Sequence, residues 1–193
     1  DLGVVEPMAR DHLAERGILG TSIMWFEWRD GSPLPPEDYR RLCLSTLTTH
    51  DLPPTAGYLD LIHVHIREEL GLLTRSVAEE EAAEEEAIDK VRRALRDRGL
   101  LAPGADDVDS VVTALHAWLA QTPSLLRGIA LADLAGDRRP INQPGTSTEY
   151  PNWSLPLAGP DGAEVLLEDL RDSHLVSGLV GTFPKKSANS RQN

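Results

Sequence analysis

A short strand-like segment that ends in two polar residues and two prolines constrains the fold of this chain most strongly. Residues 42–49, LCLSTLTT, are mostly small, apolar or β-branched, which predicts a buried strand. His50 and Asp51 follow directly, and Pro53 and Pro54 then stop the strand because proline lacks a backbone N–H. Polar residues at the carboxyl end of a strand, followed by a sharp bend, are typical of active sites in parallel α/β folds.

Two other apolar segments, 21–26 and 128–132, predict further strands. Helical spacing and capping residues predict helices around them, at 7–16, 55–73, 77–98, 107–119 and 165–175. The order of these elements corresponds to three βα-type units and part of a fourth. A closed (β/α)8 barrel has eight such units in about 250 residues, so three units and part of a fourth predict an α/β fold that is about half of such a TIM barrel.

Composition narrows the possible partners. The chain has 31 Asp and Glu against 19 Lys and Arg, a formal net charge of −12. Because phosphate binding needs clustered cations, we expect no nucleic-acid and no anionic-membrane partner. The single cysteine, Cys43, cannot form an internal disulfide, which favours a reducing compartment and a cytoplasmic location. No apolar run is long enough to span a bilayer, and no Cys or His cluster has zinc-site spacing.

A proline-rich polar loop supplies the second group of candidate site residues. Residues 136–146 read GDRRPINQPGT, and residues 150–153 read YPNW. Asn, Gln, Thr and Arg side chains beside the flat face of Trp153 suit a carbohydrate, which has polar edges and apolar faces. The residues alone leave simpler interpretations open. In these interpretations, residues 48–51 form an Asx-type turn with a packed histidine, and residues 136–153 form a surface loop held by its prolines.

Four segments, taken together and in this order, resemble the 4-α-glucanotransferases (amylomaltases or disproportionating enzymes), a branch of the α-amylase superfamily. They are DLGVV at 1–5 with GILGTSIMWF at 17–26, TTHDLP at 48–53, GDRRPINQPGT at 136–146, and YPNW at 150–153. The resemblance implies transfer of α-1,4-glucan segments between maltooligosaccharides by retaining double displacement on a (β/α)8 barrel. That mechanism uses a nucleophilic Asp and an acid/base Glu, and this family adds a third carboxylate that stabilises the distorted sugar.

The resemblance assigns site residues by position. Asp51 matches the third, transition-state-stabilising carboxylate, and His50 is expected to hydrogen-bond the same glucose unit. The loop with Asn142, Pro144 and Gly145 is expected to line the donor site, with Asn152 and Trp153 nearby. The family uses no metal and no organic cofactor, so we expect neither here.

The resemblance also implies that this chain is part of a larger catalytic domain. The family's acid/base Glu precedes the Asp-Leu-Gly that opens this sequence, and its nucleophile lies on an earlier strand. We therefore expect residues 1–183 to be the C-terminal half of the barrel, with strands six to eight and a helical insertion at about 76–122. Residues 184–193 are expected to form a disordered polar tail. Such a chain needs the missing N-terminal half as a partner and is expected to be inactive alone.

Two other functions fit some of the same features. The chain is then either a non-catalytic α-glucan-binding or scaffolding module that kept the sugar loops, or an acidic helical interaction domain built around residues 77–119. The second of these leaves the Thr-His-Asp and Asn-Gln-Pro-Gly motifs unexplained.

Overall fold

A three-stranded parallel sheet organises the computed structural model, which describes residues 6–183. Strands β1 (Gly20–Ile23), β4 (Cys43–Thr46) and β5 (Leu126–Arg127) lie in the order β1-β4-β5. Gly20 pairs with Cys43, and Leu44 pairs with Leu126. Residues 1–5, which carry the first motif, and the expected tail at 184–193 lie outside the described residues.

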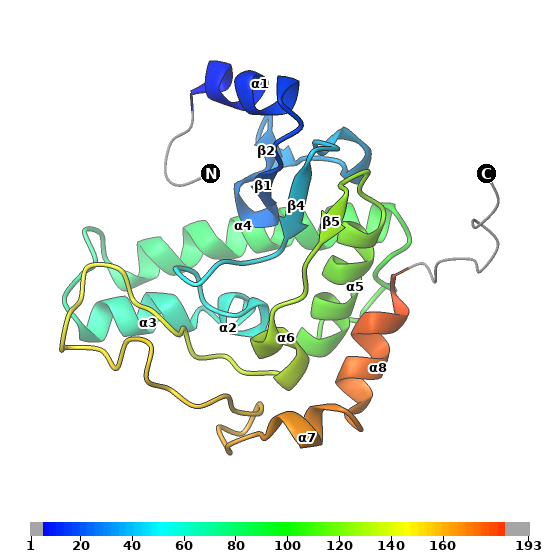
Figure 1. Ribbon diagram of the computed structural model, residues 1–193. Helices are drawn as coiled ribbons and strands as arrows, with labels where there is room; N and C mark the ends of the chain where they lie inside the picture. Colours follow the sequence, from blue (N-terminus) through cyan, green and yellow to red (C-terminus); the bar gives the residue numbers. More distant parts are fainter. Residues whose placement is uncertain (1–5, 184–193) are drawn as a thin grey trace.

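Most of the helices lie toward the carboxyl end of this sheet, and α1 lies at its opposite end (Figure 1). They are α1 (Pro7–Glu15), α2 (Thr55–Leu59), α3 (Ile62–Glu69), α4 (Val77–Asp97), α5 (Val108–Ala120), α6 (Leu131–Ala135), α7 (Leu167–Leu170) and α8 (His174–Gly181). A small antiparallel hairpin, β2 (Trp28–Arg29) with β3 (Ser32–Pro33), follows the first strand. None of the helices within residues 6–183 is both long and apolar enough to cross a membrane.

The strands are shorter than the sequence predicts, and the third one is displaced. Residues Met24–Phe26 form a 3-10 turn rather than the end of a strand. The expected strand at 128–132 is wrong, because pairing with β4 ends where the Gly128 N–H donates to the Ser45 carbonyl. Residues Leu131–Ala135, LADLA, then form α6, which Gly136 ends in the left-handed conformation at φ 77°.

Two predicted helices are interrupted. The helix expected at 55–73 is divided into α2 and α3 because Leu61 takes a left-handed conformation at φ 57°. The helix expected at 165–175 is replaced by α7 and α8. Among the leucines of this segment, Leu170 is buried, whereas Leu166 and Leu167 are exposed.

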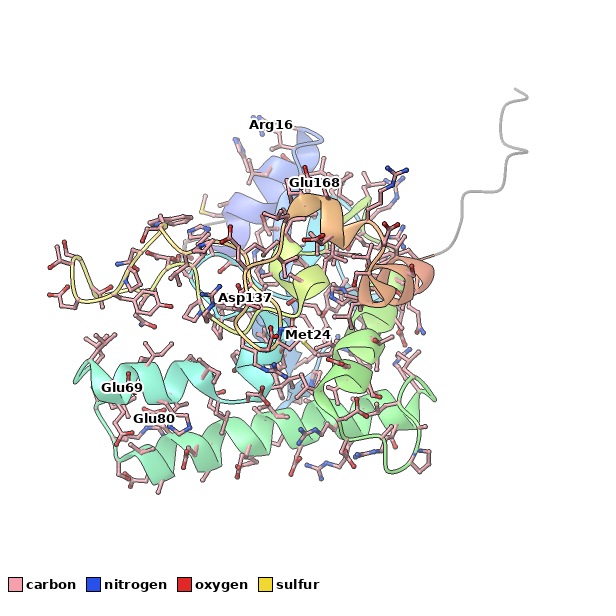
Figure 2. The ribbon with its side chains drawn as sticks, turned by 90° about the horizontal axis from the view of Figure 1, so that it is seen from below. Arg16, Met24, Glu69, Glu80, Asp137 and Glu168 are labelled. Carbon is pink, nitrogen blue, oxygen red and sulfur yellow. The ribbon has the colours of Figure 1, made fainter. Side chains whose placement is uncertain are left out.

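The long helix α4 agrees closely with its prediction. Ser76 and Glu79 form a capping box at its start, in which each side chain bonds the backbone of the other residue. Ile88, Val91 and Leu95 make a buried apolar stripe. Glu80 lies in the acidic first half of the helix, but it is buried and its carboxylate pairs with Arg75 at 2.8 Å. Figure 2 shows α3 and α4 side by side, marked by Glu69 and Glu80.

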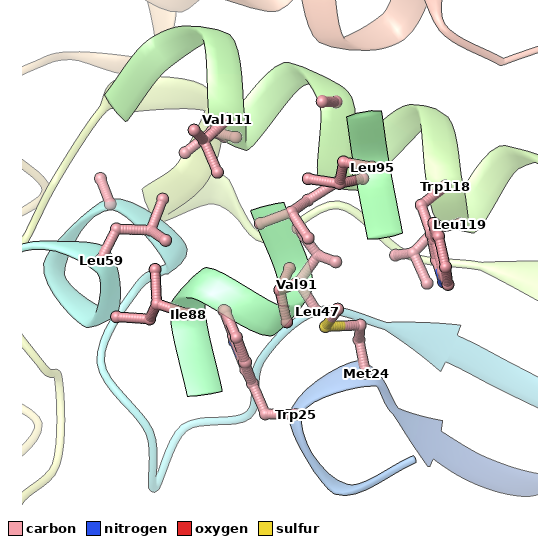
Figure 3. Close-up of a cluster of buried hydrophobic side chains, with 14 of the residues drawn as sticks. Met24, Trp25, Leu47, Leu59, Ile88, Val91, Leu95, Val111, Trp118 and Leu119 are labelled. Carbon is pink, nitrogen blue, oxygen red and sulfur yellow. The ribbon is translucent and has the colours of Figure 1, made fainter. Parts of the chain in front are cut away.

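The main core lies between the carboxyl end of the sheet and the pair α4 and α5 (Figure 3). Met24 and Trp25 enter it from the turn after β1, and Leu47 enters it from the residue just after β4. The helical contribution comes from α2, α4 and α5, with Leu59, Ile88, Val91, Leu95, Val111, Trp118 and Leu119. The loops that follow β1 and β4 are therefore anchored by buried side chains, which positions the polar tip at His50 and Asp51.

Candidate active site

The segment after β4 closes on itself and presents two polar side chains. The Thr48 hydroxyl donates to the Pro53 carbonyl at 2.8 Å, so the two ends of the loop are joined. Inside the loop, the Asp51 N–H donates to the Thr49 hydroxyl at 3.2 Å. The turn is made by a Thr hydroxyl and not by the Asx side chain that the simpler interpretation expected, and its histidine is not packed away. The side chains of His50 and Asp51 are 51% and 49% exposed.

A second loop brings an amide to the Asp51 carboxylate. Asn142 donates from Nδ2 to Asp51 Oδ1 at 2.7 Å, across 91 positions of sequence. His50 Nε2 lies 3.3 Å from Asp51 Oδ2. The Trp153 ring lies 5.3 Å from the His50 ring between centroids, tilted by 43°, and is 60% exposed. Four of the predicted site residues are therefore neighbours around one half-exposed carboxylate.

Asn152 lies near this cluster but directs its polar atoms into its own loop. Its Oδ1 accepts from the Gln143 N–H at 2.8 Å, and its Nδ2 donates to the Thr146 hydroxyl at 2.8 Å. Gly145, at φ 87°, makes the turn between these two partners, and Pro144 is exposed beside it. In this structure Asn152 shapes the loop that carries Asn142.

An ion pair that the sequence did not predict holds the base of the same loop. Asp137 is buried and accepts two side-chain hydrogen bonds from Arg139, at 3.0 and 2.9 Å. It also accepts from the Ala158 N–H at 3.0 Å, and Figure 2 places it near the centre of the molecule. Burial by itself raises the pKa of Asp137, but the hydrogen bonds from Arg139 and Ala158 outweigh it and hold the pKa below its ordinary value.

Two hollows flank the Asp51–His50 tip. A cavity of about 500 Å³ has Thr48, Thr49 and His50 on one wall and the Asp137–Arg139 pair on another. Most of its remaining lining is apolar and includes Leu131, Ile141 and Leu167, all exposed. A second hollow of about 380 Å³ lies between Asp51, Gln143 and α3. Polar groups beside apolar walls can bind a sugar ring by its edge and by its face.

Within residues 6–183 no three His, Cys, Asp or Glu side chains lie close enough together to hold a metal ion. The Asp51 carboxylate can contribute in two ways. Its oxygens accept hydrogen bonds from hydroxyl groups, and its negative charge stabilises a positive charge that develops nearby.

The site thus lies at the carboxyl-end side of a parallel sheet, the usual place of active sites in such α/β folds, and combines a carboxylate, an amide and an aromatic ring. A family model described as 4-alpha-glucanotransferase, glycoside hydrolase family 77, matches residues 1–160. The chain belongs to this family.

Individual relatives agree with the family match. The 4-alpha-glucanotransferase of Mycobacterium tuberculosis is 56% identical over 177 residues, which cover 88% of this chain and 24% of that protein. The 4-alpha-glucanotransferase of Haemophilus influenzae is 30% identical over 169 residues, 83% of this chain and 24% of that protein. The chain therefore spans about a quarter of the length of these curated relatives.

Solved structures extend the likeness to the fold. The crystal structure of amylomaltase from Corynebacterium glutamicum superimposes with a TM-score of 0.88 at 39% identity, over 94% of this chain and 28% of that one. Amylomaltase from Streptococcus agalactiae, in complex with acarbose, superimposes with a TM-score of 0.55 at 19% identity, over 94% of this chain and 30% of that one. This second likeness concerns the fold alone.

Proposed function

We propose that this chain is part of a 4-α-glucanotransferase that moves α-1,4-glucan segments between maltooligosaccharides by retaining double displacement. One observation carries the proposal. The Asp51 carboxylate, in the loop after the central strand, is held by Asn142 from a loop 91 residues later, and both lie within the residues that the family model matches.

In this proposal Asp51 stabilises the transition state. The sugar ring that is being transferred flattens and gains positive charge as its glycosidic bond breaks. The Asp51 carboxylate binds the hydroxyl groups of that ring more strongly in the flattened form, and its charge offsets the developing positive charge. Asn142 holds one carboxylate oxygen in place at 2.7 Å, and His50 donates to the same glucose unit.

The loop supplies the other contacts to the glucan. The exposed Trp153 face offers an apolar surface for a sugar ring, and the turn at Pro144 and Gly145 lines the donor side. Asn152 acts indirectly, by bonding Gln143 and Thr146 within the loop.

Double displacement also needs a nucleophile and an acid/base, whose carboxyl groups lie about 5–5.5 Å apart in retaining enzymes. We assign neither role to a residue of this chain, and we propose that another part of the full-length protein supplies both. Residues 1–193 alone are then inactive.

The partner in this proposal is the remainder of the same barrel. β1 and β5 are both edge strands of the three-stranded sheet, and parallel sheets are normally covered or extended on all sides. The exposed leucines at 131 and 167, beside the 500 Å³ cavity, suit such a covering surface. We propose that β1, β4 and β5 are strands six, seven and eight of that barrel, in the cytoplasm.

Incubation of the full-length protein with maltotriose tests the function. We expect glucose together with maltotetraose and longer products, all with retained α configuration. Residues 1–193, assayed alone at the same concentration, are expected to give none of these products. If the full-length protein leaves maltotriose unchanged, the proposed transfer activity is wrong.

A second candidate, a non-catalytic α-glucan-binding module, is favoured by the exposure of the binding side chains. Asp51, His50 and Trp153 are each about half exposed or more in this chain. Calorimetric titration of the full-length protein with maltoheptaose separates the two candidates. Clear binding without any transfer products supports the module, whereas binding with product formation supports the enzyme.

A further inference from the structure

A buried polar cluster lies directly behind the loop that carries Asp51. Asp133, on α6, has a side chain that is 1% exposed. Its Oδ1 accepts from the Thr55 N–H at 2.8 Å, and its Oδ2 accepts from the Thr55 hydroxyl at 2.8 Å. His116, fully buried on α5, has its Nε2 3.3 Å from the same Oδ2. Figure 1 shows α6 beside α2 and α5, where this cluster forms.

The residue that Asp133 holds is the first one after the site loop. Thr55 begins α2, four positions after Asp51, and no side-chain cap is formed by Pro54. Pro53 and Pro54 lie between them, so the segment has few accessible conformations. The Thr48 hydroxyl joins the other end of the loop to Pro53. Because this segment is stiff, a displacement of Thr55 would also displace Asp51.

Burial makes the hydrogen bonds between Asp133 and Thr55 hard to replace. Thr55 and Asp133 are 0% and 3% exposed, so water does not replace the hydrogen bonds if one partner is removed. A carboxylate that receives both an N–H and an O–H from one residue fixes the position and the orientation of that residue. Apolar side chains of the same size could fill the space behind the loop, but they would not fix its position. The two hydrogen bonds add a defined placement of the loop.

We propose that Asp133 is a positioning residue, which fixes Asp51 against the glucan through Thr55, with His116 packed beside its carboxylate. The inference rests on the proposed function, because it concerns the efficiency of that reaction. Asp133 touches neither the substrate nor the reacting atoms. Its loss lowers the rate because a carboxylate that is displaced by about 1 Å can cost on the order of 100-fold in catalysis.

The test uses the full-length protein with Asp133→Ala, Asp133→Asn and Thr55→Val. For maltotriose transfer by Asp133→Ala we expect kcat to fall on the order of 100-fold while KM stays nearly unchanged. Asp133→Asn still accepts from the Thr55 N–H, and Thr55→Val loses only the hydroxyl bond. Each is expected to lose roughly tenfold or less, but measurably.

Glu80→Gln is the matched control. Glu80, on α4, is a buried acid that pairs with Arg75. Its change to Gln replaces a carboxylate by an amide, as Asp133→Asn does, but away from the loop. We expect its kcat to equal that of the wild type. Amide hydrogen exchange of the peptide 48–55 is expected to accelerate in Asp133→Ala and to stay unchanged in Glu80→Gln.

The outcomes separate the two claims. If Asp133→Ala is folded and keeps both the wild-type kcat and the wild-type exchange of residues 48–55, the positioning role is wrong. If Asp133→Ala does not fold, wild-type kcat in both Asp133→Asn and Thr55→Val overturns it instead. If the wild-type protein transfers no glucan, the proposed function fails, and the exchange of residues 48–55 still decides whether Asp133 holds the loop.

Discussion

Individual residues at the site divide into those with a local sequence signal and those without one. His50 and Asp51 follow a predicted strand and precede two prolines, and Asn142 lies in a loop motif, so all three could be predicted as site residues, and the structure brings them together. The partners of Asp133 and Asp137 could not. The Thr55–Asp133 contact joins positions 78 residues apart, and only the isolated charge within the apolar segment LADLA hints that it is buried.

Asn142→Ala tests the contact that joins the two loops. Removal of the amide leaves Asp51 Oδ1 without its 2.7 Å donor, so the carboxylate is free to rotate away from the glucan. We expect kcat/KM for maltotriose transfer by the full-length protein to fall about tenfold, the value of one such hydrogen bond. Gln121→Ala, at the exposed C-terminus of α5, is the control and should have no effect. An Asn142→Ala enzyme with wild-type kcat/KM would contradict the assignment of Asn142.

The ion pair of Asp137 and Arg139 predicts a pH dependence of stability. The pKa of Asp137 is lowered in the folded chain, so its contribution to stability is fully present above the unfolded value of about 3.9. That contribution is lost as the pH falls below about 4 and through the folded pKa. We expect Asp137→Asn to unfold at a lower temperature than the wild type at pH 7, and this difference to shrink at pH 3. If the difference in unfolding temperature between the wild type and Asp137→Asn instead grows as the pH falls, the predicted pH dependence is wrong.

At the scale of elements, periodicity predicted the helices better than the strands. The stripe of Ile88, Val91 and Leu95 and the capping box at Ser76 define α4 from local residues alone. Strand ends depend on partners that are distant in sequence, so the displacement of the third strand to Leu126–Arg127 could not be predicted. The break at Leu61 likewise follows from packing, because nothing in that residue type favours φ 57°.

Gly57→Ala tests how closely α2 approaches the second loop. A Cβ at Gly57 would lie 2.0 Å from the Arg138 carbonyl oxygen, so the helix and the loop must separate. We expect the free energy of unfolding to fall by about 1–3 kcal/mol, as for other overpacked sites. Transfer activity should fall as well, because the same loop carries Asn142. Chemical denaturation and a maltotriose assay measure both effects. Gly178→Ala, on α8, meets no atom within 4 Å and has no left-handed backbone, so it is the comparison for the cost of a methyl group at a helical glycine.

At the scale of the whole molecule, the sequence predicted a parallel α/β chain that is part of something larger. The family match over residues 1–160 and the superposition on C. glutamicum amylomaltase at a TM-score of 0.88 agree with that prediction. A parallel sheet of three short strands with two edges, and exposed leucines around a 500 Å³ cavity, are the physical reasons to expect a covering partner. The motifs indicated the family that the comparison shows, whereas the partners expected from composition remain predictions.

The most direct measurement is the rate of maltotriose transfer by full-length protein carrying Asp51→Asn. The substitution keeps the size of the side chain and removes its negative charge, so the protein should fold and bind glucan while kcat falls by at least about 100-fold. Asp30→Asn, in the exposed turn between β2 and β3, makes the same change away from the site and should retain the wild-type rate. A folded Asp51→Asn enzyme with the wild-type kcat would contradict the account.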